Sequence, residues 1–166
     1  MKRKSALALV VCLAGLAVYV GNVRATPANG FVGTTIAKAT LAELDTHVHS
    51  VPGAWQAWLK TKGLSDLYVQ SNVWQPGGST GWHTHPGPSL VVVTAGTLTV
   101  YDGDDPSCTP QVYTPTGNNS FVDVGGGDVH LIKNEGSVEA RTIAVQFVPA
   151  GATRRIDAEA PAACSS

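Results

Sequence analysis

The sequence has little positive charge to offer a polyanion. Its 166 residues include 11 Lys and Arg against 12 Asp and Glu, and four of the basic residues, Lys2, Arg3, Lys4 and Arg24, lie within the first 25 positions. Beyond residue 25, seven basic residues face 12 acidic ones, which gives a net charge of −5 with histidine neutral. A mildly acidic chain without a basic cluster argues against nucleic acid as a partner.

Long apolar runs are also scarce, and the one that exists lies near the N-terminus. Residues 5–20 carry no charge, follow the basic residues 2–4, and are succeeded by Ala25, a small residue suited to cleavage. This is the three-part layout of a secretory signal peptide. We therefore expect residues 1–25 to be removed and the protein to be exported, either to the periplasm or out of the cell. The alternative is an uncleaved membrane anchor, for which the apolar run is short.

Cysteine is rare as well. Cys12 lies inside the apolar run, so only Cys108 and Cys164 remain after cleavage. Exported proteins mature in an oxidising compartment where disulfides persist. We expect a Cys108–Cys164 bridge that ties the end of the sequence to a mid-chain loop, with two free thiols as the alternative.

Helical signals are few: residues 35–44 fit either a strand or a short helix, and residues 54–62 show helical periodicity. Trp55, Trp58 and Leu59 stand there at i, i+3, i+4 spacing, and Gly63 follows, which predicts a short helix within an N-terminal extension of residues 26–65. In residues 66–149, short strands rich in Val and aromatic residues alternate with Gly and Pro turns. This pattern, without an internal repeat, predicts one small all-β domain, an antiparallel sandwich or barrel. Residues 150–166 read as a polar tail.

The strongest chemical signal is a histidine pair within residues 76–96. His83 and His85 stand one residue apart, and on a strand such a pair points to one face. His130, in a later strand, is the candidate for a third ligand. Three neutral imidazoles suit Zn, Cu, Fe and Ni, and three histidines with an open position form a known catalytic arrangement for zinc.

The spacing around these histidines resembles the two motifs of the cupin superfamily. The first motif runs G-x5-H-x-H-x3,4-E-x6-G, and the second ends in G-x2-H-x3-N. The matching positions in this sequence are Gly77, His83, His85, Gly96, Gly127, His130 and Asn134. The resemblance implies a small antiparallel β-barrel of jelly-roll type, with a metal ion held inside it by His83, His85 and His130.

One position departs from the motif: Ser89 stands where the family usually has its glutamate ligand. Serine is a poor metal ligand at neutral pH, so two outcomes stay open. Three histidines alone hold the metal, as in some dioxygenases of the superfamily, or the barrel is a metal-free binding pocket. The identity of a divalent metal, whether Fe, Mn, Zn, Cu or Ni, stays open too.

Other polar residues are weaker candidates. Gln146, among small neighbours on the last strand, and Gln70, on a polar strand face, are candidates for the pocket together with Ser89. A second pair, His47 and His49, could bind metal with Asp45, but a surface strand end is the simpler interpretation. The acidic loop at residues 102–105 lacks the spacing of a calcium loop.

The function that follows is an exported protein binding one divalent metal, with small-molecule oxidoreductase activity of dioxygenase type as the first enzymatic hypothesis. The alternatives are a non-enzymatic module that binds a small ligand or a metal, and an isomerase or lyase. No residue stands out as a general base, so the catalytic residues stay unknown. Barrels of this kind often pair, which makes a homodimer a further expectation.

Overall fold

The computed structural model describes residues 25–50 and 53–165, and the predicted signal peptide lies outside this part apart from Ala25. Within the described residues, no helix is long and apolar enough to cross a membrane. The elements are β1 (Asn29–Leu41), β2 (Asp45–His49), β3 (Gln56–Lys60), β4 (Ser65–Ser79), β5 (His83–Thr84), β6 (Ser89–Ala95), β7 (Leu98–Asp102), β8 (Gln111–Tyr113), β9 (Ser120–Asp123), β10 (His130–Lys133), β11 (Ala140–Pro149), β12 (Ile156–Asp157) and a 3-10 turn, η1 (Ala162–Cys164).

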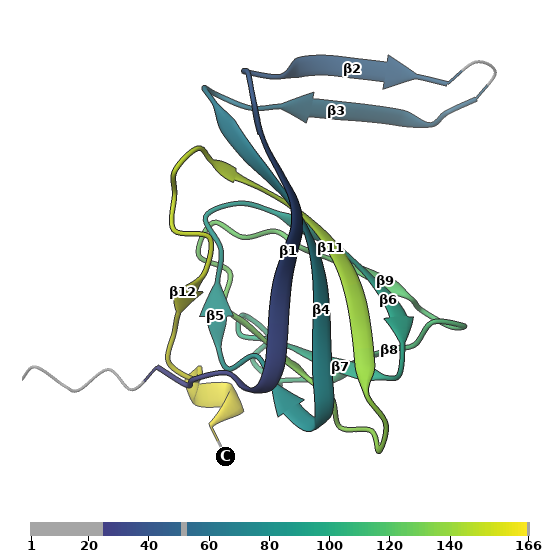
Figure 1. The fold of residues 1–166 in the computed structure, drawn as a ribbon, viewed down its shortest axis with the longest axis vertical. Helices are drawn as coiled ribbons and strands as arrows, with labels where there is room; N and C mark the ends of the chain where they lie inside the picture. Colours follow the sequence, from purple (N-terminus) through teal and green to yellow (C-terminus); the bar gives the residue numbers. More distant parts are fainter. Residues whose placement is uncertain (1–24, 51–52, 166) are drawn as a thin grey trace, which may run out of the picture.

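Ten of the strands form one antiparallel sheet that curls into a nearly closed barrel (Figure 1). Its hydrogen-bonded path runs β12-β5-β10-β4-β11-β6-β9, with β1 added beside β4, β7 added beside β10, and β8 added beside β7. The all-β fold predicted from the strand pattern, and the antiparallel barrel of jelly-roll type implied by the motif resemblance, are therefore confirmed. Because β1 pairs with β4 along its length, the segment predicted as an extension contributes a strand to the barrel.

Alternation along the strands decides what faces the barrel interior. In β11, every second residue from Ala140 to Val148 is buried, and the residues between them are more exposed. This is the two-residue period of a sheet with one covered face. A cluster of buried apolar residues fills one part of the interior, among them Trp74, Val93, Leu98 and Ile132.

Two of the motif positions, Gly96 and Asn134, have structural roles in this chain. Gly96 begins the turn between β6 and β7 with φ +70°, and a Cβ atom there would lie 2.6 Å from the carbonyl oxygen of Glu139. Asn134 is fully buried, and its Nδ2 donates to the backbone oxygens of Trp74, at 3.2 Å, and Val138, at 2.7 Å. These positions shape turns of the barrel rather than its chemistry.

The predicted helix at residues 54–62 is wrong. The chain forms β3 there, which pairs with β2 in a two-stranded hairpin that projects from one end of the barrel (Figure 1). Trp58 is 66% exposed, so the apolar spacing has no surface to bury against, and a helix this short is marginal without packing. Tryptophan is favoured in strands, and pairing with β2 satisfies the backbone.

Part of the polar tail, residues 150–166, is paired with the barrel. Its β12 pairs with β5, at Ile156 opposite Thr84 and Asp157 opposite His83. Beyond β12, Cys164 in η1 is joined to Cys108 by a disulfide with a Cα–Cα distance of 5.3 Å, as predicted. The tail is thus held against the barrel beside the histidine strand.

Candidate metal centre

Two short strands bring the three histidines together. His83 opens β5 and pairs directly with His130, the first residue of β10. The turn before β5 depends on Gly81, which has φ +68° and whose missing Cβ would overlap the backbone oxygen of Thr26. This close approach of the N-terminal segment requires glycine.

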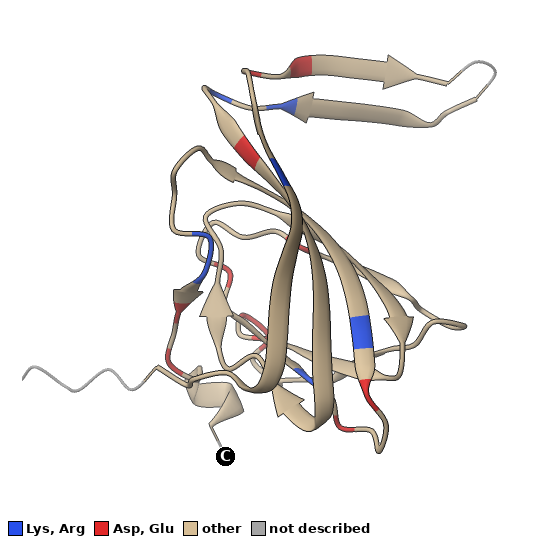
Figure 2. Ribbon diagram, in the orientation of Figure 1, with Lys and Arg blue, Asp and Glu red and all other residues tan. Residues whose placement is uncertain are grey.

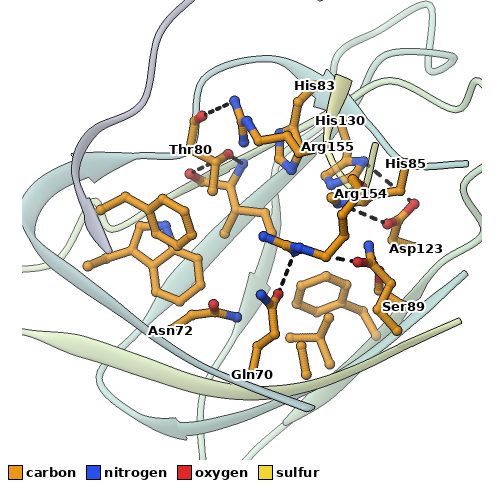
Figure 3. A pocket seen from close by; sticks show the side chains of 17 residues that line it. Gln70, Asn72, Thr80, His83, His85, Ser89, Asp123, His130, Arg154 and Arg155 are labelled. Carbon is orange, nitrogen blue, oxygen red and sulfur yellow. Dashed lines mark hydrogen bonds and ion pairs between the residues drawn. The ribbon is translucent and has the colours of Figure 1, made fainter. Parts of the chain in front are cut away.

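The three imidazoles face one another inside the barrel (Figure 3). Ring centroids are 4.3 Å apart for His83 and His130, 4.9 Å for His83 and His85, and 5.4 Å for His85 and His130. One nitrogen from each ring lies within 4.8 Å of the others, and all three side chains are buried. The three residues predicted as ligands therefore form a cluster that could hold a metal ion.

Backbone carbonyls orient two of these rings. The Nδ1 atom of His83 lies 2.9 Å from the carbonyl oxygen of Gly81, and that of His85 lies 2.7 Å from the carbonyl oxygen of Arg154. A carbonyl only accepts, so Nδ1 carries the proton in each ring and Nε2 keeps its lone pair. Such outer partners fix ring orientation in metal sites.

Burial keeps the histidines neutral. It lowers the pKa of His83 to about 2, helped by the nearby His130, and lowers the pKa of His85 to about 4, although the hydrogen bond that His85 donates to the Arg154 carbonyl acts to raise it. The pKa of His130 is also lowered, again chiefly by burial. Neutral imidazole is the form that binds metals, so all three side chains are ready to act as ligands at neutral pH.

A carboxylate that the motif did not reveal completes the cluster. Asp123 ends β9, where it pairs directly with Ser89 of β6. Its Oδ2 lies 3.6 Å from Nε2 of His85, and its Oδ1 lies 3.6 Å from Nδ1 of His130. The residue opposite position 89 on the neighbouring strand thus brings a carboxylate beside two of the three imidazoles.

Two buried atoms at this point have no hydrogen-bond partner within the part of the chain that the structure describes. They are Oδ2 of Asp123 and Nδ1 of His130, whereas Oδ1 of Asp123 accepts from the backbone N–H of Gly125 at 2.9 Å. Buried polar groups normally find a partner, and an orphan carboxylate oxygen is costly. A cation between the carboxylate and the imidazoles would satisfy it.

The predicted pocket residues line the same cavity, which has a volume of about 60 Å³. Gln146 Nε2 donates to Oγ of Ser89 at 2.9 Å, and both side chains are buried. Gln70 also lies on the cavity wall. The Ser89 hydroxyl is therefore hydrogen-bonded to the side-chain amide of Gln146 on β11 and not to the histidines.

Arg154 is the second residue that the sequence did not mark. It lies between β11 and β12, on the basic stretch of the segment that leads into β12 (Figure 2), and its side chain enters the cavity. Its Nη1 donates to Oε1 of Gln70 at 2.6 Å and approaches Oε1 of Gln146 at 3.4 Å. Burial lowers the pKa of its guanidinium.

The second histidine pair lies apart from this cluster. His47 and His49 are exposed on β2, with their Nε2 atoms 3.0 Å apart and the Trp58 ring beside them. Asp45, the third member considered, is bound to Lys60 at 2.7 Å. The pair sits on the projecting hairpin and brings no further His, Cys, Asp or Glu within ligand distance among the described residues.

No family model and no curated protein matches the chain. Solved structures similar to about half of it include an oxalate oxidase, at 22% identity and a TM-score of 0.41 over 51% of this chain and 46% of that chain. A cupin domain from Bordetella pertussis matches at 24% identity and a TM-score of 0.39, over 49% of this chain and 80% of that chain. A predicted oxalate decarboxylase from Thermotoga maritima matches at 18% identity and a TM-score of 0.41, over 52% of this chain and 83% of that chain. The chain thus spans less than half the length of the oxalate oxidase.

Proposed function

We propose that this protein is a cupin-type barrel that binds one divalent metal ion through His83, His85 and His130. The observation that carries the proposal is the orphan Oδ2 of Asp123, which faces neutral imidazoles in a buried cluster. Imidazole nitrogens with one carboxylate oxygen form a donor set suited to Fe, Mn, Zn, Cu or Ni. The residues present therefore fit a metal, and Asp123 takes the role that the motif gives to a glutamate.

The chemistry we propose is oxidation of a small molecule, of dioxygenase type. A bound metal ion would supply a Lewis acid or a redox centre with positions left open for ligands. The chain's own contribution is to orient the ligand rings through the carbonyls of Gly81 and Arg154. The barrel excludes bulk water, and amide and guanidinium groups in the cavity bind the organic molecule.

A non-enzymatic binding module is the second candidate, and isomerase or lyase chemistry is the third. The binding module is favoured by the cavity's polar wall, where Gln70, Gln146 and Arg154 are bound to one another. These groups hold protons tightly at neutral pH, so none of them is suited to act as a general base.

Export remains part of the proposal. The Cys108–Cys164 disulfide suits an oxidising compartment outside the cytoplasm, and contact with a membrane would come only through the N-terminal segment. The expected partner is a small molecule rather than nucleic acid.

The deciding experiment measures metal content and oxygen uptake of the full chain purified without chelators. We expect about one metal ion per chain, and oxygen consumption with some members of a panel of small organic substrates. Folded protein that takes up none of Fe, Mn, Zn, Cu or Ni would contradict the metal centre. Bound metal with no oxygen uptake would remove the dioxygenase assignment in favour of the second and third candidates.

A further inference from the structure

Arg154 is a half-buried cation at the cavity that has no acidic partner among the described residues; its guanidinium lies over the Tyr68 ring, 5.9 Å from the ring centroid. Its hydrogen bonds go to the amide oxygens of Gln70 and Gln146, which are neutral. Among the described residues no carboxylate lies within ion-pair distance of its guanidinium, whereas the neighbouring Arg155 is paired with Asp157 at 2.7 Å. A half-buried charge without a counter-charge is costly, which suggests that a ligand supplies the missing anion.

The guanidinium still has donors to offer. Arginine carries five N–H groups in a planar fork that matches the two oxygens of a carboxylate. The amide contacts use only Nη1. Figure 3 shows the guanidinium extending across the cavity, with Gln70 and Ser89 on one side of it and the histidine cluster on the other. A carboxylate bound to the remaining donors would therefore lie next to the three histidines.

The charges in the cavity point the same way. The acidic and basic side chains that line it, apart from the histidines, are Asp123, Arg154 and the paired Arg155. Addition of a divalent ion to these groups leaves an excess of two positive charges once the Arg155–Asp157 pair is counted as neutral. This charge count rests on the proposed function because it includes the metal ion, whereas the lack of an acidic partner for Arg154 does not depend on it.

The size of the cavity limits the ligand. Its volume is about 60 Å³, so the ligand is a small molecule. We propose that Arg154 binds the carboxylate of a small organic acid, whose other end faces His83, His85 and His130.

One residue then links the two halves of the site. The side chain of Arg154 binds the acid, while its backbone oxygen holds Nδ1 of His85 at 2.7 Å. A substitution of the side chain leaves that carbonyl in place. Ligand binding and metal binding are therefore separable by mutation.

The experiment compares lactate with lactamide, its neutral isostere, by titration calorimetry on the full chain in metal-free and metal-loaded forms. We expect lactate to bind at least about 10-fold more tightly than lactamide in both forms, since hydrogen bonds to charged groups are the stronger ones. Equal affinity for the two compounds, or binding of neither, would overturn the assignment. This comparison needs no variant.

Variants then locate the effect. Arg154→Gln should weaken lactate binding by about 10- to 100-fold, and Arg154→Lys by less, because lysine keeps the charge but loses the fork. The matched control is Arg141→Gln, since Arg141 is exposed and paired with Glu139; it should bind lactate as the unaltered protein does. Thermal unfolding of each variant checks that it folds.

Metal content separates this inference from the proposed function. Arg154→Gln should retain the metal content of the unaltered protein. If the unaltered protein takes up no metal but still prefers lactate in an Arg154-dependent way, the metal centre fails and the acid site stands. If metal binds and Arg154→Gln binds lactate normally, the acid site is refuted and the metal centre stands.

Discussion

The chain contains the same His-x-His pattern twice, and the two copies meet very different surroundings. His47 and His49 lie on the projecting β2–β3 hairpin, exposed to solvent, with their Nε2 atoms 3.0 Å apart. His83 and His85 lie inside the barrel, only 4% and 8% exposed. Spacing alone thus places two imidazoles on one side of the chain and goes no further.

What distinguishes the pairs is the neighbouring strand. Opposite His47, β3 presents Trp58, which cannot bind a metal. Opposite His83, β10 presents His130, and β9 adds Asp123 within 3.6 Å of His85. A pair becomes a candidate centre when the fold supplies the remaining donors and removes water.

The largest expected difference between the pairs concerns metal affinity. His130→Ala removes one of the three proposed imidazole ligands, so we expect metal affinity to fall by more than about 100-fold, beyond the loss typical of outer-shell partners. The double variant His47→Ala/His49→Ala is the matched control and should bind metal like the unaltered protein. Titration with Zn²⁺ or Mn²⁺ measures both, and a large loss in the double variant would reverse the comparison.

The next effect is acid destabilisation of the metal-free barrel. The pKa of His83 is about 2 and that of His85 about 4 in the folded protein, both below the value of 6.5 for an unperturbed histidine. Between pH 6.5 and 4 the unfolded chain therefore binds more protons than the folded one, and stability falls as pH falls. Each of these histidines contributes a loss of about 1.4 kcal/mol per pH unit.

Denaturant unfolding at pH 7, 6, 5 and 4.5 measures this loss. His83→Gln should reduce the number of protons taken up on unfolding by about one, because the variant has no imidazole at this position. The unfolding free energy should then depend less steeply on pH. An unfolding free energy that stays constant from pH 7 to 4.5 would contradict this prediction, because it would mean that the histidines have the same pKa in the folded and the unfolded chain.

The smallest of the three effects tests the carboxylate. Asp123→Asn keeps the shape of the side chain but removes its charge, so we expect metal affinity to fall by about 10-fold, the lower end for partners that support a metal site. Asp104→Asn, in an exposed loop, is the control. Unchanged metal affinity in Asp123→Asn would mean that the three histidines bind the metal without help from the carboxylate.

The sequence indicates the barrel more fully than the site. Alternation in strands such as β11, and the turn at Gly96, are local properties that the amino-acid pattern carries directly. The three histidines were predictable because glycine and asparagine positions at fixed spacing accompany them. The predicted helix around Trp58 failed because periodicity says nothing of whether a surface exists to bury the apolar face.

Asp123 and Arg154 could not be predicted for a different reason. Asp123 is marked only as an acid at the end of an apolar strand, and its role depends on pairing with Ser89, which strand order decides. Arg154 lies in a segment that reads as a polar tail, and its function depends on where that segment folds back. Residues that act through strand pairing or chain return leave no local pattern.

The Cys108–Cys164 bridge holds the segment that completes the site. The residues His83, His85, Asp123 and His130 all precede residue 150, whereas the Arg154 carbonyl, which accepts from His85, and β12, which pairs with His83, follow it. The disulfide ties the chain just beyond β12 to the loop that contains Cys108. Reduction of this one bond would therefore loosen the segment on which the positions of two histidines depend.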